Sequence, residues 1–172
     1  MRIFFLFKSI LFISVLSLTA TLVHAQESIP AIATLLQIEG GVEVVNDKSP
    51  KGRQGRDGML LFAGNKIRTS GKSKATVEYR DGSRVRLFQN SDFLLDFSEE
   101  QNTSKRTFKY LVTLNNGSLR GRFKKGLQRT KIRTPTALIG VKGTSVRISE
   151  NKNKATVSLT EGQVEVLSLI HI

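Results

Sequence analysis

Carboxylates that could serve acid–base catalysis gather in one segment of the chain, at Asp92, Asp96, Glu99 and Glu100. Inverting glycosidases need two such groups roughly 6.5–9.5 Å apart. Asp92 and Asp96 could share one face of a strand, but four residues of extended chain would separate them by about 13 Å. Glu99 and Glu100 are adjacent and would point to opposite faces. We therefore expect no catalytic residue and no enzymatic activity.

The chain also has little material for metal or nucleophilic chemistry. It contains no cysteine, which excludes disulfides, thiolate-bound zinc, iron–sulfur clusters and a cysteine nucleophile. Its two histidines, His24 and His171, lie at opposite ends of the chain. A Ser-His-Asp triad or a multi-histidine metal site would need imidazoles in between. The sequence therefore predicts no metal site and no cofactor.

Basic residues are the best candidates for a functional surface. The 172 residues include 27 Lys and Arg but only 14 Asp and Glu, a formal net charge of +13. The segment from Gln101 to Ser149 carries twelve of these basic residues and no acid, which favours attraction to an anionic partner. The candidate binding patch consists of Arg120, Arg122, Lys124, Lys125, Arg129, Lys131 and Arg133.

Strand alternation predicts how this patch would be displayed. In the segment 119–123, Arg120 and Arg122 alternate with apolar residues and glycine, so both arginines would share one face of a strand. Lys131 and Arg133 would likewise share a face of the next strand, and the two strands could present one basic surface. The alternative is a solvated polar face that protects a sheet edge.

Short strands are the elements that must position these residues. Period-two alternation recurs along the chain, whereas no long segment shows the helical spacing of apolar residues. We therefore predict an all-β fold, a rolled or sandwich-like antiparallel sheet of β-roll or β-helix-like type, preceded by a helical signal peptide. The polar segments 48–58 and 99–105 are predicted to be loops. The predicted core includes Val44, Ile67, Val77, Val85, Leu87, Leu114, Ile132, Val146, Val157 and Val164.

Several turn residues have both a structural and a functional interpretation. The segment 81–83 predicts a hairpin turn, with cation or sugar binding as the alternative. The segment 143–144 predicts a tight turn or bulge, with a backbone nest for an anion as the alternative. The residues concerned, together with a third turn and a strand end, are Asp81, Gly82, Ser83, Gly117, Thr134, Pro135, Gly143 and Thr144. The segments 39–45 and 161–167 also resemble each other, which we attribute to reuse of a glycine turn followed by alternating valines.

The first 25 residues predict an export signal. A basic start is followed by an apolar run, ILFISVLSL, and by small residues that end at Ala25. The uncharged stretch 9–23 has 15 residues, fewer than the roughly 20 needed to span a bilayer. We expect cleavage after Ala25, a periplasmic or otherwise exported protein, and no integral membrane span after cleavage. The predicted organisation is a signal peptide over 1–25, an N-terminal segment over 26–34, a β domain over 35–168, and a C-terminal end over 169–172 that is either a final strand or truncated.

Five pieces of sequence follow one another at residues 64–69, 75–87, 114–119, 132–137 and 141–148, and they include the Asp-Gly-Ser turn, a Thr-Pro pair and a Gly-Thr element. In this order they resemble the FecR domain family. The resemblance implies a β-rich extracytoplasmic module. The best-known members of that family are inner-membrane regulators with a cytoplasmic anti-sigma segment, one membrane span and a periplasmic domain that responds to an outer-membrane receptor loaded with a ferric siderophore. This chain departs from that plan because it begins with an expected cleavable signal.

These observations predict an exported, non-catalytic FecR-like domain of the Gram-negative envelope that binds an envelope protein or an anionic polysaccharide. The alternative is a periplasmic sensor domain in transmembrane signalling to a sigma factor, as in regulation of iron uptake. A third possibility, nucleic-acid binding, is suggested by the basic composition. The export signal, the two tyrosines and the absence of tryptophan disfavour it, so we expect no specific nucleic-acid partner. The oligomeric state stays open.

Overall fold

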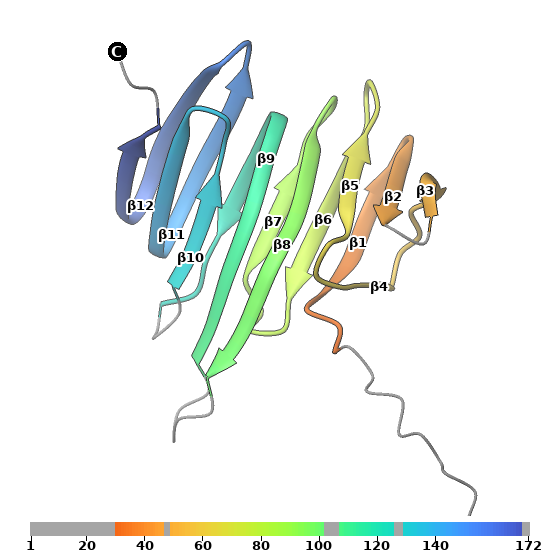
Figure 1. Ribbon diagram of the computed structural model, residues 1–172, viewed down its shortest axis with the longest axis horizontal. Helices are drawn as coiled ribbons and strands as arrows, with labels where there is room; N and C mark the ends of the chain where they lie inside the picture. The colour runs from red at the N-terminus through yellow and green to blue at the C-terminus, as the bar shows by residue number, and fades with distance from the viewer. Residues whose placement is uncertain (1–29, 47–48, 102–106, 126–128, 170–172) are drawn as a thin grey trace, which may run out of the picture.

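The computed structural model describes residues 30–46, 49–101, 107–125 and 129–169 (Figure 1). All regular elements in these residues are strands, which confirms the predicted all-β class. The strands are β1 (Ala33–Glu39), β2 (Val42–Asn46), β3 (Ser49–Gln54), β4 (Met59–Leu61), β5 (Lys66–Thr69), β6 (Lys74–Tyr79), β7 (Arg84–Leu87), β8 (Asp92–Gln101), β9 (Thr107–Arg122), β10 (Arg129–Arg133), β11 (Ala137–Asn151) and β12 (Lys154–Ser168). The described part of the chain holds no helix long and apolar enough to cross a membrane. The predicted signal peptide and residues 170–172 lie outside it.

These strands form one curled sheet that is almost entirely antiparallel. Its main path runs β3-β2-β5-β8-β9-β7-β6-β1-β4, and β10, β11 and β12 extend it beyond β9. β10 pairs with β9 in parallel, whereas the other described pairs are antiparallel. β1 begins at Ala33, two residues before the predicted start of the β domain.

The sheet folds into two facing layers, and each of its longest strands lies with one half in each layer. Residues 107–116 of β9 pair with β8, whereas residues 117–122 pair with β7 and β11. β11 behaves in the same way, since residues 138–141 pair with β10 and residues 145–150 pair with β9. Figure 1 shows β9 rising at the front, turning at the top and descending behind. We call β2, β5, β8, β10 and the first halves of β9 and β11 the front layer, and β1, β6, β7 and the second halves the back layer.

Gly117 forms the corner of β9. Its φ of +95° lies in the region that glycine adopts without steric cost. A Cβ atom at this position would lie 2.4 Å from Ser91 Oγ and 2.5 Å from Ser91 Cα. Ser91 also holds the corner in place, because its Oγ donates to Phe88 O at 2.8 Å and accepts from Ser118 N at 3.1 Å. A glycine is therefore required where β9 changes layer.

A second corner lies where β12 passes from the back layer to the front. A Cβ atom on Gly162 would lie 2.4 Å from Gly143 O, so the two strands approach more closely here than a side chain allows. The register between β11 and β12 shifts between Lys142 and Ser145, which marks a bulge at the same place. Gly40 makes the equivalent step from β1 to β2. The sequence similarity of segments 39–45 and 161–167 thus coincides with a similar corner in each.

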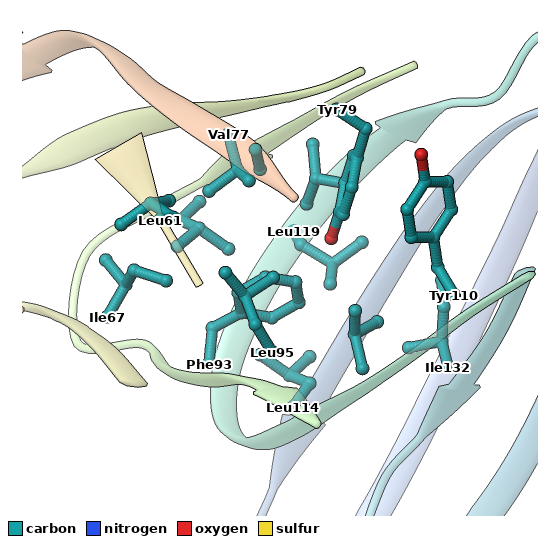
Figure 2. Packing of buried hydrophobic residues seen from close by; sticks show 14 of the residues in the cluster. Leu61, Ile67, Val77, Tyr79, Phe93, Leu95, Tyr110, Leu114, Leu119 and Ile132 are labelled. Atoms are coloured by element: carbon teal, nitrogen blue, oxygen red, sulfur yellow. The ribbon is translucent and has the colours of Figure 1, made fainter. Parts of the chain in front are cut away.

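The hydrophobic core fills the space between the layers. Figure 2 shows Phe93 and Leu114 of the front layer packed near Val77 and Leu119 of the back layer. Eight predicted core residues are buried, namely Val44, Ile67, Val77, Val85, Leu87, Leu114, Ile132 and Val146. The other two, Val157 and Val164, are only partly buried and pack against this core. Both lie on β12, an edge strand whose single partner among the described strands is β11.

Two segments predicted as loops contain strands. Ser49–Gln54 forms β3, which pairs with β2 at the edge of the sheet. An edge strand with no buried face needs no alternation of apolar residues, so its polar, glycine-containing sequence gave no strand signal. Residues 99–101 extend β8 and pair with the start of β9, and residues 102–106 of that predicted loop lie outside the described residues.

Tyr79 and Tyr110 join the two layers, since Tyr79 ends β6 in the back layer and Tyr110 lies on the front part of β9. Their ring centroids are 4.6 Å apart with an interplanar angle of 46° (Figure 2), a tilted contact favoured between aromatic rings. Burial raises the pKa of Tyr79 well above its usual value, and charges on Tyr110 and Asp81 raise it further. The Tyr79 hydroxyl has no hydrogen-bond partner in the described structure.

We expect Gly117→Ala to destabilise the fold by about 3 kcal/mol, since it combines backbone strain with a clash against Ser91. Gly58→Ala is the matched control, because Gly58 also has a positive φ of +80° but no atom lies within 4 Å of its added Cβ. The control should lose only about 1 kcal/mol. Urea unfolding of both variants measures the loss in free energy of unfolding. Equal losses would contradict the prediction that the close approach of Gly117 to Ser91 excludes a side chain.

Stability should fall at alkaline pH through Tyr79. A tyrosine whose folded pKa is raised contributes stability that is fully present below the unfolded pKa of about 10 and is lost as pH rises through the folded value. Tyr79→Phe should abolish this part of the alkaline loss. At pH 7 it should be neutral or stabilise by up to about 1 kcal/mol, because it removes an unpartnered hydroxyl. Urea midpoints between about pH 7 and pH 11 test this, and unchanged alkaline sensitivity in the variant would contradict it.

Candidate anion-binding surface

The fold divides the predicted basic patch between its two layers. Arg120 and Arg122 are exposed on the outer face of the back layer, because the residues between and beside them point into the core. Lys131 and Arg133 are exposed on β10. β10 pairs with residues 109–113 of β9, in the front layer, and not with the half that carries the arginines. The single surface that we expected from two neighbouring strands is therefore not formed.

The remaining predicted patch residues lie around the end of β9. Lys124 N donates to Ser83 Oγ at 3.2 Å, which ties the chain after β9 to the β6–β7 turn. Lys125 Nζ lies 3.5 Å from Glu161 Oε1, and both side chains are strongly exposed, so this ion pair contributes little to stability. Arg129 begins β10, and its side chain lies outside the described part of the structure.

Arginines from two other strands take the place of the missing partners. In the register between β7 and β9, Arg84 lies opposite Arg122 and Arg86 lies opposite Arg120. On the other side of β9, Arg147 of β11 also lies opposite Arg120. We call these five residues, Arg84, Arg86, Arg120, Arg122 and Arg147, the arginine face. In segment 84–87, as in segment 119–122, two arginines are separated by one residue. This spacing was the sequence signal that could have placed Arg84 and Arg86 on an exposed strand face.

Among the residues that the structure describes, acidic partners of the arginine face occur only on its β7 side. Arg84 Nε donates to Glu78 Oε2 at 2.8 Å. Arg86 Nη2 donates to Glu39 Oε1 at 3.2 Å, and Glu39 also accepts from Lys74 Nζ at 3.1 Å. The face and Lys74 thus carry six positive charges against the two negative charges of Glu78 and Glu39.

The two arginines of β9 are the uncompensated centre of the face. Neither Arg120 nor Arg122 forms an ion pair or side-chain hydrogen bond with any described residue. The guanidinium of Arg147 lies 5.5 Å above the centre of the Phe88 ring, a cation–π contact that leaves its N–H groups available. Like charges directly opposite each other on neighbouring strands destabilise a sheet. Stability alone therefore does not account for this arrangement, whereas binding of an anion would.

Two shallow depressions open on this outer face. The first, of about 210 Å³, is lined by Gln37, Thr76, Arg84, Arg86, Arg120, Arg122 and Ser145. Within it, Thr76 Oγ1 donates to Gln37 Oε1 at 3.0 Å, which fixes both side chains. The second, of about 400 Å³, is lined by Lys72, Ser73, Lys74, Phe88, Gln89, Ser118 and Arg147. Arginine and lysine together with hydroxyl and amide groups suit recognition of oxyanions and hydroxyl-rich molecules.

The Asp-Gly-Ser turn closes the hairpin between β6 and β7. The Asp81 carboxylate accepts from Ser83 N at 2.7 Å and from Ser83 Oγ at 2.9 Å. Gly82, with a φ of +80°, donates from its N–H to Tyr79 O at 2.8 Å. Both carboxylate oxygens of Asp81 thus have partners within the turn, so this segment has the geometry of a structural turn.

The other predicted turn residues also have partners within the fold. Thr134 Oγ1 accepts from Ala137 N at 3.0 Å, which closes the turn through Pro135 between β10 and β11. Thr144, beside Gly143 in the β11 bulge, accepts at its Oγ1 from Lys142 N at 3.0 Å and donates to Gln163 O at 2.9 Å. These contacts hold the turn and the bulge in shape.

The acidic residues first considered for catalysis have partners as well. Asp92 accepts from Arg68 Nε at 3.3 Å and from Asn115 Nδ2 at 2.8 Å, and Lys66 Nζ lies 3.8 Å away. Asp96 accepts a hydrogen bond from Thr113 Oγ1. In the part of the chain that the structure describes, no group of three His, Cys, Asp or Glu residues could hold a metal ion.

Comparison with known proteins identifies a family. A family model described as FecR protein matches residues 65–165, which is more than half of the chain. The arginine face lies within this match, whereas β1 to β4 precede it. A search of the curated proteins found no match.

The fold is also found in a solved structure. A crystal structure described as a "putative anti-sigma factor from Parabacteroides distasonis ATCC 8503" superposes with a TM-score of 0.50 at 20% sequence identity. The match covers 60% of this chain and 47% of that one, so this chain spans about half the length of its structural neighbour. At this identity the likeness concerns the fold.

Arg120→Gln should stabilise the protein by about 0.5 kcal/mol at low salt, because it removes two like-charge contacts, with Arg86 and with Arg147. Arg133→Gln is the matched control, since it removes the same charge from a residue that lies opposite Leu138 and Thr113. Thermal unfolding at about 0.01 M and about 1 M NaCl measures both variants. The Arg120→Gln gain should vanish at high salt, and an equal gain from Arg133→Gln would contradict specific repulsion within the arginine face.

Proposed function

The chain belongs to the FecR protein family, and from this we propose that it is an exported, non-catalytic recognition domain of the Gram-negative cell envelope that binds an anionic partner through its arginine face. One observation carries the proposal: Arg120 and Arg122 are exposed at the centre of five arginines and have no acidic partner among the described residues. A planar guanidinium presents paired N–H donors that match carboxylate, sulfate and phosphate groups.

Recognition accounts for this surface better than catalysis does. The two depressions on the arginine face are shallow and open, so bulk water would reach any bound group. The carboxylates of Asp92 and Asp96 accept hydrogen bonds from Asn115 and Thr113, which link β8 to β9 in the front layer. Binding needs only the exposed donors that the arginine face supplies.

Export rests on the N-terminal sequence. Its basic start, short apolar run and small residues up to Ala25 have the order of a cleavable signal. A partner in the envelope would be an envelope protein with an acidic surface or an anionic polysaccharide. Either would be held by charge, so its binding should weaken as salt screens the arginine face.

A second candidate function is that of a periplasmic sensor domain in signalling to a sigma factor. It is favoured by family membership together with the structural neighbour, which is itself described as an anti-sigma factor. This function would need the N-terminal apolar segment to stay in the membrane as an anchor. The fate of residues 1–25 therefore distinguishes the two candidates.

Expression of the full-length chain in Gram-negative cells, followed by fractionation and intact-mass measurement, tests export. We expect the protein in the periplasmic fraction with Gln26 as its first residue. Recovery from the inner membrane with residues 1–25 attached would overturn the exported form and favour the anchored sensor.

The exported protein should bind washed envelope fragments at about 0.05 M NaCl and be released at about 0.5 M, because screening shortens the reach of its charges. The double variant Arg120→Gln, Arg122→Gln should bind at least several-fold more weakly. The double variant Lys131→Gln, Arg133→Gln loses the same charge from the front layer and should bind almost as well as the unmodified protein. Equal loss in both variants would contradict binding through the arginine face.

A further inference from the structure

The arginines of the back layer form a row that crosses the strands. Arg86 of β7, Arg120 of β9 and Arg147 of β11 lie opposite one another in register. Neighbouring strands are about 4.8 Å apart, so the row offers one guanidinium per strand step. This step is about the length of one sugar residue in an extended polysaccharide. The row therefore suits a linear ligand with one anionic group on each repeating unit.

The two depressions flank this row. Arg86 and Arg120 line the smaller one, and Arg147 lines the larger one. Both contain hydroxyl and amide side chains, with Thr76 and Ser145 in the first and Ser118 in the second. Such groups exchange hydrogen bonds with sugar hydroxyls, which both donate and accept. A ligand that lies along the row would meet polar side chains on both sides of its charged groups.

Unsatisfied donors are present along the row before any ligand binds. The Nε atom of Arg86 is buried and has no hydrogen-bond acceptor in the described structure, although its Nη2 contacts Glu39. Arg120 has no side-chain hydrogen-bond acceptor among the described residues, and its two cross-strand neighbours are arginines. An anion placed beside Arg120 would accept from its exposed guanidinium and offset its repulsion with Arg86 and Arg147.

The composition of the face disfavours other polyanions. Binding of single-stranded nucleic acid relies on aromatic platforms for successive bases. Phe88 is the aromatic residue lining these depressions, and the Arg147 guanidinium lies over its ring. The face is also broad and shallow, whereas a compact anion such as inorganic phosphate would use only a small part of it.

We propose that the arginine face binds a linear acidic polysaccharide, with successive anionic groups on Arg86, Arg120 and Arg147 and the sugar chain running across β7, β9 and β11. This inference rests on the proposed function, because it names the partner for the same surface. Its chemistry is that of one carboxylate or sulfate group per sugar. A uronic-acid polymer and a sulfated polymer are the two sources of such groups.

Calorimetric titration of the exported protein with oligogalacturonates of increasing length tests the inference. The affinity should rise on the order of tenfold from the monomer to the trimer, because each added carboxylate meets a further guanidinium. It should then level off once the row of three arginines is filled. Heparin oligosaccharides of matched length supply sulfate groups for comparison. Tighter binding of one series shows whether the ligand is a uronic-acid polymer or a sulfated polymer. Affinity that does not depend on length in either series would overturn the inference.

Variants and competitors locate the binding. Arg120→Gln with Arg122→Gln should weaken trimer binding several-fold, because it removes the middle guanidinium of the row, whereas Lys131→Gln with Arg133→Gln should change it less than twofold. Far-ultraviolet circular dichroism and thermal unfolding verify that both variants fold. Equal weakening by the two pairs would overturn the inference, because it would indicate diffuse attraction by net charge.

Polyglutamate and inorganic phosphate separate the proposed ligand from its alternatives. We expect polyglutamate of equal charge to bind several-fold more weakly than the oligosaccharides, and phosphate to compete only at much higher concentration. Equal binding of polyglutamate would overturn the polysaccharide and favour an acidic protein partner. If the protein binds envelope fragments through Arg120 and Arg122 but binds neither oligosaccharide, the inference fails and the proposed function stands. If it binds no envelope fraction, the proposed function itself fails.

Discussion

The architecture depends on one backbone constraint, which is that a strand can turn from one layer into the other only where no side chain obstructs it. In β9 that place is Gly117, whose missing Cβ leaves room for the backbone of Ser91. Because β9 turns there, its first half pairs with β8 and β10 and its second half with β7 and β11. The corner thus brings arginines from three strands into one outer face and encloses the core between the layers.

Much of the fold was predictable because alternation reports which side of a strand meets the core. It placed Val77, Val85 and Ile132 inside, and it placed Arg120 and Arg122 on one exposed face. It failed at the edges of the sheet, where a strand can form with no buried side. β3 therefore went unrecognised, and Val157 and Val164 of β12 are less buried than their pattern suggested.

The sequence pattern did not predict which strands pair with one another. A short connection follows β9, so its second half and β10 were expected to lie side by side. The turn at Gly117 had already carried that half into the back layer, and β10 pairs in parallel with the earlier half. Arg84 and Arg86 were missed for the same reason, since they precede Arg122 and Arg120 by more than thirty residues and lie opposite them only through the register of β7 and β9. Alternation describes one strand at a time, whereas a binding surface is shared among several.

Because β9 pairs with strands of both layers, it also determines the order in which the strands can pair during folding. Its partners β7 and β8 precede it in the chain, whereas β10 and β11 follow it. Neither layer is therefore built from one contiguous segment of the chain. During synthesis from the N-terminus, one edge of β7 stays unpaired until β9 has been made. Pairing between distant segments slows folding and prolongs the exposure of unpaired strands to other chains. The arginines that alternate along β7 would then guard its open edge against pairing with other chains.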